Sequence, residues 1–315
     1  MRTLRQLACA TLRKLQEKPP AQQSLAKARE YAYLHYIYFP LPLEQVRTHL
    51  LQRTESQQMA SMYRLARLAE QGDRFVRTWS ETAMQRGRAV TPRQALAWME
   101  TSLDGGICLD RLLGDSFVLL PAGVDVAASP AIDSRLSIHV KEAFADFLSE
   151  VLFELLSRGE AGVSHIKLLG IKRWPVRTET AIVYLPEAVP QEARRLATGI
   201  DDALRRKIDA PPGAGFYAAP PPGTQCITPG IAYSETAPGH AAVMSAGQSR
   251  AAVVAAAVWD TLTAGADLDA ALDKQLADAG YAIANPAFVQ RPDDAGGAVA
   301  EREAALLGAA PPRTG

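Results

Sequence analysis

Cysteine and histidine are scarce in this sequence, with 3 Cys and 5 His among 315 residues. Cys9, Cys108 and Cys226 lie far apart, and neither they nor the histidines have the short spacing of metal-ligand motifs. An odd, scattered set of cysteines is also not a disulfide framework. We therefore expect reduced thiols in a cytoplasmic protein and no metal site.

Excess charge is also missing, because 34 Lys and Arg balance 34 Asp and Glu. A neutral chain has no global field to attract nucleic acid or an anionic membrane, so any anion site must be local. The most apolar stretch, Ala251–Trp259, is too short to span a bilayer. The N-terminus is basic and Arg/Leu-rich rather than Ser-rich and disordered, which argues against an export signal.

Several catalytic motifs are absent as well. Without a P-loop or a G-x-G-x-x-G turn, the chain is not expected to bind nucleotide or to be a kinase. Without a G-x-S-x-G elbow, serine hydrolase chemistry has no support. A cysteine hydrolase using Cys226 with His139, His165 or His240 stays open, but no nucleophile motif surrounds Cys226 and a buried thiol is the commoner case.

The front of the chain is expected to be helical. Leucines recur at helical spacing from Leu4 to Leu15, and helical patterns continue through Tyr31–Tyr38 and from Leu43 to Arg86. Asp104–Gly106 predicts the turn of a hairpin. We expect a mainly helical region over residues 1–128, with a boundary uncertain by about ten residues.

The middle of the chain alternates strands and helices. Residues 135–140, 165–171 and 180–186 have strand patterns, whereas residues 141–159 and 190–208 are amphipathic helices. This order predicts an α+β fold, with a mixed sheet flanked by helices over residues 129–290. Residues 291–315 are rich in Ala, Gly, Pro and charge, and we expect a loose tail.

Basic and polar groups gather on the predicted strands. With a period of two, Arg135, Ser137 and His139 share one strand face, and His165 and Lys167 share the next. Arg173 and Arg177 follow in a short connection. Such a cluster repels itself unless it binds an anion, and phosphate is the usual candidate. The alternative is an ordinary solvent-facing strand surface.

A second candidate anion site lies at the start of the apolar helix that begins near Gln248. Ser245, Gly247 and Arg250 surround its N-terminus, where backbone N–H groups favour negative charge. The same composition is also typical of a plain helix cap.

Three segments resemble the HopA effector family: TPGIAYSETAPG at 228–239, SAGQSRA at 245–251 and IKLLGIKRWPVRTETAIVYLP at 166–186. The resemblance covers about residues 135–259. Members of that family are type III secreted effectors, and related domains accompany genes for thioamitide and class V lanthipeptide biosynthesis. A more distant similarity links the family to secreted phosphothreonine lyases.

The resemblance implies a lyase that removes phosphate from Ser or Thr of a precursor peptide after a kinase-like partner has phosphorylated it. It further implies Lys167 as the base, His139 as the acid, and no metal or organic cofactor. The implied phosphate contacts are Arg135, Arg173, Arg177, Arg250 and Ser245. The pattern departs from the family at Ala246, where an aromatic residue is usual, and near Thr228, where a lysine is often found.

Two other functions remain open on the sequence. A non-catalytic protein could use the same basic groups to hold a phosphopeptide or a kinase partner, and a type III secreted effector would fit the family name. The expected strand at residues 135–140, which carries the implied acid His139, distinguishes catalysis from binding. Elimination needs a working acid, and it also needs a neutral lysine, whose pKa must fall from about 10.4.

Overall fold

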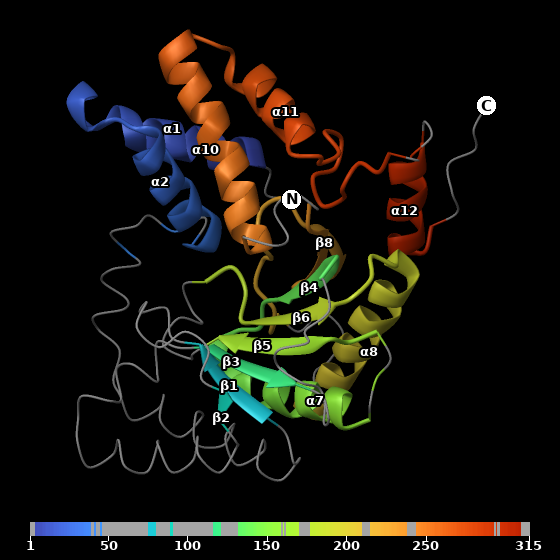
Figure 1. The fold of residues 1–315 in the computed structure, drawn as a ribbon. Coiled ribbons are helices and arrows are strands. Elements are labelled where there is room, and N and C mark those ends of the chain that lie inside the picture. The colour runs from blue at the N-terminus through green and yellow to red at the C-terminus, as the bar shows by residue number, and fades with distance from the viewer. Residues whose placement is uncertain are drawn as a thin grey trace, which may run out of the picture.

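The chain folds around one large sheet with helices on both of its faces (Figure 1). The structure is a computed structural model that describes residues 4–38, 75–79, 89–90, 116–120, 132–158, 162–169, 177–209, 215–237, 244–292 and 297–309, together with a few single positions. The α+β class expected from the sequence is confirmed.

Eight strands form the sheet in the order β2-β1-β3-β5-β6-β4-β8-β7. All the pairings described are antiparallel, whereas a mixed sheet was expected. The reason is that β6 lies between β4 and β5, so these two strands run alike without touching. The strands are β1 Phe75–Trp79, β2 Ala89–Val90, β3 Ser116–Leu120, β4 Ser134–Ile138, β5 His165–Leu169, β6 Ala181–Leu185, β7 Gln225–Thr228 and β8 Ile231–Glu235.

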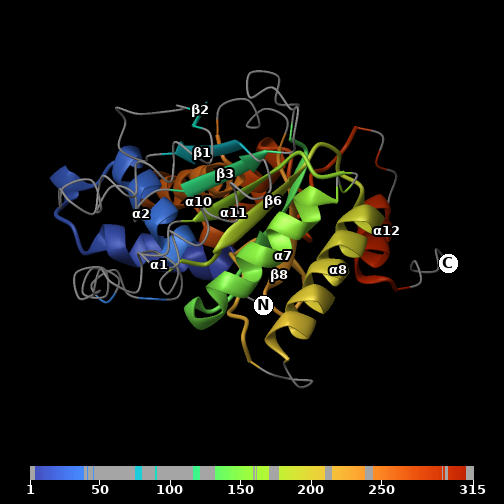
Figure 2. The same ribbon diagram turned by 90° about the horizontal axis from the view of Figure 1, so that it is seen from below.

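Seven α-helices of the described residues divide into two groups (Figure 2). Helices α7 and α8 lie against one face of the sheet, with α12 beside α8, and helices α1, α2, α10 and α11 form a separate group on the other side. Their bounds are α1 Leu4–Gln16, α2 Leu25–Tyr38, α7 Ala145–Ser157, α8 Pro190–Ile208, α10 Ala246–Ala264, α11 Leu268–Asp278 and α12 Ala298–Leu307.

The first group makes an apolar core with the sheet. Helix α8 illustrates why: Pro190 occupies its first turn, and its buried positions recur at helical spacing from Ala193 to Leu204. These side chains pack with α7 on alternate residues of the central strands, including Leu136, Ile138 and Val183. This core fixes which face of the sheet is left for polar groups.

The second group has its own core, built from both ends of the chain. Helices α1 and α2, which the sequence predicted, pack on α10 and α11 through residues such as Leu7, Leu15, Val254 and Leu272. The N-terminal helices therefore share a core with the C-terminal half. The expected boundary near residue 128 stays a prediction.

Two expectations about local structure are wrong. Strand β1 lies within the stretch expected to be helical, because its β-branched and aromatic residues pair with β3. Helix α12 lies within the expected loose tail, where Leu306 is buried and Arg302 bonds to the body of the protein. The hairpin turn expected at Asp104–Gly106 lies outside the described residues. Among the described helices, none is both long and apolar enough to cross a membrane.

Candidate functional site

Polar side chains on the central strands form two rows across the face opposite α7 and α8. The register aligns His165, Tyr184, Arg135 and Ser234 across β5, β6, β4 and β8. The next row on this face contains Lys167 and Ser137, separated by Ile182 of β6. We call these two rows the polar face. The sequence prediction that basic groups share one surface is consistent with this register.

Arg135 lies at the centre of a buried network. Its Nη2 donates to the Tyr36 hydroxyl at 3.2 Å and lies 3.8 Å from the Glu179 carboxylate, while its Nε donates to Ser234 at 3.4 Å. Only 2% of Arg135 is exposed. Burial works to lower its pKa, but Glu179 and the neighbouring phenols outweigh that effect and raise it. Arg135 is therefore a permanent, neutralised cation inside the protein.

Glu179 is the second member of this network. Its carboxylate accepts a 3.0 Å hydrogen bond from the Ser137 hydroxyl. The carboxylate therefore neutralises part of the positive charge that was expected from the sequence to bind an anion. The sequence did not predict the contact between Glu179 and Arg135, because it depends on how the loop before β6 folds.

Tyr184 and His165 form the part of the first row that is not fully buried. Their rings stack with centroids 4.2 Å apart and an angle of 20° between the planes. Burial raises the pKa of Tyr184 to about 12, although the charge of Arg135 opposes this shift. The phenol therefore stays protonated at neutral pH. Sequence analysis missed Tyr184 as a site residue; the available signal was a tyrosine at the end of an otherwise apolar strand.

Arg177 lies in a segment that helix α2 holds in place. The Thr178 N–H donates to the carbonyl of Ile37 at 2.9 Å, and the Thr178 hydroxyl donates to the carbonyl of Tyr36 at 3.2 Å. The Arg177 guanidinium lies 5.8 Å from the centre of the Tyr38 ring. Carbonyls at the end of a helix have no partner within it, and here the Arg177 segment satisfies two of them.

Lys167 and His139 differ in their surroundings. Lys167 is partly exposed on β5, in line with Ile182 and Ser137. His139 follows β4 and is 8% exposed, and its Nδ1 lies 2.8 Å from the carbonyl oxygen of Ala219. His165 is the imidazole on the same strand as Lys167. The structure brings Lys167, His165 and the Arg135 row to one face, with His139 beyond the end of β4.

Arg250 is part of the scaffold. It is fully buried, and its nitrogens donate at 2.8–3.4 Å to four main-chain carbonyls, those of Gly223, Glu235, Ala246 and Pro286. A guanidinium with these acceptors joins the start of α10 to β8 and to the segments before β7 and after α11. We therefore assign Arg250 to structural cross-linking rather than to ligand contact, against the expectation from the resemblance.

Ser245 is the N-cap of α10. Its hydroxyl accepts from the Gln248 N–H at 3.3 Å, and the Gln248 side chain accepts from the Ser245 N–H at 2.9 Å, which makes a capping box. The cap accounts for Ser245 without a ligand. Arg173 lies outside the described residues.

Cys226 has the properties of a structural thiol. It is half-buried on β7, and burial raises its pKa. A raised pKa leaves less of the nucleophilic thiolate at neutral pH, so the cysteine hydrolase alternative gains no support. In the described parts of the chain, His, Cys, Asp and Glu side chains form no group able to hold a metal ion.

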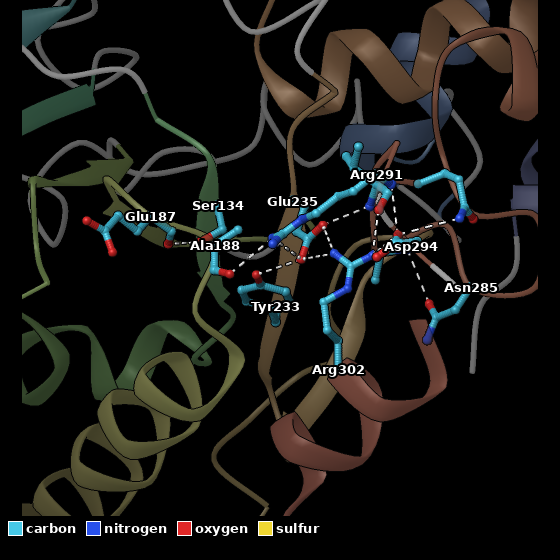
Figure 3. A network of polar contacts seen from close by, with 12 residues as sticks. Ser134, Glu187, Ala188, Tyr233, Glu235, Asn285, Arg291, Asp294 and Arg302 are labelled. Atoms are coloured by element: carbon cyan, nitrogen blue, oxygen red, sulfur yellow. Dashed lines mark hydrogen bonds and ion pairs between the residues drawn. The ribbon is translucent and has the colours of Figure 1, made fainter. Parts of the chain in front are cut away.

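A second polar network closes the end of β8 and lies apart from the polar face (Figure 3). The Glu235 carboxylate accepts from Arg302 of α12 at 2.9 and 3.0 Å and from the Val289 N–H at 2.8 Å. Arg302 also donates to Asp294 at 2.8 Å. Glu235 borders a groove of about 430 Å³, whose walls include Val189 and Arg291. Sequence analysis did not anticipate this network, because Arg302 lies in the segment expected to be loose.

These features define an α+β protein with an antiparallel sheet, one apolar face and one polar face that contains the buried Arg135–Glu179 ion pair. The HopA1 effector protein family model matches residues 112–288, which is more than half of the chain. The chain belongs to that family. The match is longer than the resemblance seen in the sequence, and it includes β3.

Solved structures support the fold. The effector protein from Pseudomonas syringae pv. tomato strain DC3000 is 18% identical, with a TM-score of 0.62 over 91% of this chain and 97% of that chain. The effector protein from Pseudomonas syringae pv. syringae strain 61 is 20% identical, with a TM-score of 0.61 over 91% of this chain and 98% of that chain. No curated protein matches the sequence.

Proposed function

We propose that this protein is a lyase that eliminates phosphate from phosphorylated Ser or Thr in a precursor peptide. A kinase-like partner supplies the phosphorylated peptide in the cytoplasm, and the product contains dehydroalanine or dehydrobutyrine, as in lanthipeptide and thioamitide biosynthesis. Membership of the HopA1 family and the resemblance to phosphothreonine lyases support the reaction class.

One observation carries the proposal: Lys167 lies partly exposed on the polar face, next to His165 of the same strand and two strands away from the buried Arg135. Only the neutral amine can act as a base, so the proposal requires that the pKa of Lys167 falls when the substrate is bound. Arg135 is too buried to touch a ligand as it stands, and Glu179 pairs with its charge.

In this reaction the Lys167 amine takes the Cα proton of the phosphorylated residue. The electron pair of that C–H bond becomes the Cα–Cβ double bond, the Cβ–O bond breaks, and phosphate leaves with the bonding electrons. An imidazole then has the task of protonating the leaving oxygen. The resemblance assigns that role to His139, whereas His165 lies on the same strand as Lys167.

The resemblance assigns direct phosphate contact to Arg177, which is 5% exposed and would have to become accessible to make it. An Arg–phosphate pair is often bidentate, and such oriented contacts stabilise a departing dianion. The hold of α2 on Thr178 fixes the segment that carries Arg177.

A binding protein that holds a phosphopeptide without reaction is the second candidate. The buried Arg135–Glu179 pair favours it, because this pair has already neutralised one of the cations. A secreted effector is the third, and its support is that the similar solved structures are effector proteins of Pseudomonas syringae.

Intact mass spectrometry of a phosphoserine/phosphothreonine peptide tests the proposal. The peptide is incubated with the protein, and an unphosphorylated precursor is incubated with the protein and the kinase-like partner. We expect a loss equal to one phosphoric acid per phosphorylated site, without return to the hydroxyl form. An unchanged mass together with measurable affinity for the phosphopeptide would replace the lyase with the binding protein.

A further inference from the structure

Tyr184 and His165 are where the first row of the polar face meets solvent. Within this row Arg135 and Ser234 are buried, whereas both rings are partly exposed. Anything that binds over this row therefore meets the phenol and the imidazole before it meets the guanidinium. Lys167 follows His165 on the same face of β5, one strand away from Tyr184.

Arg135 determines what the Tyr184 hydroxyl can do. Arg135 is the cross-strand neighbour of Tyr184, and its charge acts on this phenol. A guanidinium has only donors, so it cannot accept the phenol's proton, and that proton is left for another group. With its pKa at about 12, the phenol keeps that proton at any physiological pH.

The stack on His165 determines where the ring lies. Two nearly parallel rings with centroids 4.2 Å apart restrict each other's rotation. Tyr184 is therefore a neutral donor whose ring stacks on His165 and whose cross-strand neighbour is Arg135. A positioned donor of this type suits an oxyanion better than a neutral ligand, because hydrogen bonds to charged acceptors are the stronger ones.

Helix α2 supports Arg135 from behind. The Tyr36 hydroxyl accepts from Arg135 at 3.2 Å, and Tyr36 is fully buried. Its ring lies over the start of α10, where a Cβ added at Gly247 would come within 2.8 Å of a ring carbon. Glycine in the SAGQSRA segment thus makes room for Tyr36. Helix α2 and the start of α10 together fix the guanidinium that lies opposite Tyr184.

The geometry points to Tyr184 as a hydrogen-bond donor to the phosphate of the substrate, with Tyr36 as the positioning residue that acts through Arg135. The ligand class rests on the proposed function, namely a phosphate monoester on a peptide Ser or Thr. The donor itself is inferred from the contacts of Tyr184. The inference also makes α2 part of the site, so residues 129–290 alone would not complete it.

The first test is Tyr184→Phe in a Lys167→Ala background, so that no turnover occurs during the measurement. Isothermal titration gives the Kd for a phosphothreonine peptide and for the same peptide without phosphate. We expect Tyr184→Phe to weaken phosphopeptide binding about 10-fold, since a hydrogen bond to a charged group is lost, and to leave the other peptide unchanged. A change of less than twofold would overturn the inference.

Tyr217→Phe is the matched control. Tyr217 is also partly buried, and its phenol donates to Asp201 at 2.8 Å, on the side of the sheet that packs on α8. Its substitution also removes a hydrogen bond to a charged group but leaves the polar face unchanged, so phosphopeptide affinity should stay within twofold. Equal losses in the two variants would show that general destabilisation is responsible and would overturn the inference.

Tyr36→Phe tests the positioning role. We expect about threefold weaker phosphopeptide binding, and little further loss when Tyr36→Phe is added to Tyr184→Phe, because both act on one donor. Tyr31→Phe, in the same helix, is the control. A fully additive loss in the double variant would overturn the link through Arg135.

These outcomes separate the inference from the proposed function. Elimination with no role for Tyr184 leaves the lyase standing and overturns the donor. Phosphate-dependent binding that needs Tyr184, without elimination by the protein that retains Lys167, supports the donor and overturns the lyase. Equal affinity of the Lys167→Ala protein for the phosphorylated and unphosphorylated peptides overturns the donor directly.

Discussion

The two faces of the central sheet differ in the polarity of the side chains that are buried on them. Beneath α7 and α8, aliphatic side chains from alternate strand positions make a continuous apolar core. On the other face Arg135 and Glu179 are buried as an ion pair among hydroxyl groups. Burying ions costs free energy that well-packed aliphatic side chains do not cost, so the polar face is not explained by stability alone. The difference indicates a face kept for binding or chemistry.

Charge is also buried at two places that serve structure. Arg250 joins α10 to main-chain carbonyls, and Arg302 joins α12 to Glu235. These contacts use the same chemical groups as the polar face, but their role is structural, because they join fixed parts of the fold. Substitutions can separate the two kinds of buried charge.

The largest expected effect is that of Arg250→Ala. It removes the donor from four main-chain carbonyls, two of them in buried and two in part-buried contacts. Each unsatisfied buried group costs about 1–3 kcal/mol, so we expect a loss on the order of 4 kcal/mol in the free energy of unfolding. Urea unfolding followed by circular dichroism measures it. The exposed Arg29→Ala in α2 is the control and should change stability by less than about 0.5 kcal/mol. A similarly small loss for Arg250→Ala would contradict its structural role.

Arg302→Ala should have the second-largest effect on stability. Removing Arg302 leaves the buried Glu235 with only the longer, 3.7 Å ion pair to Arg291, and we expect a loss of about 3 kcal/mol in the same assay. The double variant with Glu235→Gln should recover part of this loss, since the buried charge is then gone. No recovery would mean that α12 is held mainly by its apolar contacts.

The buried tyrosines predict a loss of stability in alkali. Burial raises the pKa of Tyr36, and it raises that of Tyr184 to about 12. Because the folded protein holds these protons more tightly than the unfolded chain, their contribution is fully present below about pH 10 and is lost as the pH rises to about 12. Urea unfolding at pH 9, 10 and 11 should show this decline in the free energy of unfolding. Tyr184→Phe should reduce the total decline over this range by about 1–2 kcal/mol. An equal decline in the variant and in the unsubstituted protein would show that folding does not raise the pKa of Tyr184.

Ser245→Ala should have the smallest effect. Loss of the N-cap should destabilise the protein by about 1 kcal/mol and leave phosphopeptide affinity unchanged, because the hydroxyl is used within the capping box. Thermal unfolding and isothermal titration measure the two quantities. A loss of affinity with unchanged stability would restore Ser245 as a phosphate contact.

The sequence predicted the strand periodicity of the polar face better than its contents. Alternation correctly placed Lys167 and His165 on one face of β5, because a side-chain period of two needs no tertiary information. The role of Arg250 was not predictable, since its acceptors are main-chain carbonyls from segments far apart in the chain.

The neutralising partners were missed for the same reason. Glu179 and Tyr36 meet Arg135 only once the loop before β6 and the end of α2 have folded onto the sheet. Helix α12 was expected to be loose from its composition, yet Arg302 holds it on Glu235. Composition reports local preference, whereas these contacts join residues far apart in the sequence.

Substitution of Lys167 tests the central claim, that the polar face is a site of phosphate elimination, most directly. Lys167→Ala and the exposed Lys141→Ala are compared by intact mass spectrometry of a phosphothreonine peptide, after circular dichroism has shown equal folding. The account predicts that Lys167→Ala loses elimination by at least about 100-fold, as expected for removal of a general base, while Lys141→Ala retains it. Full elimination by Lys167→Ala would contradict the account.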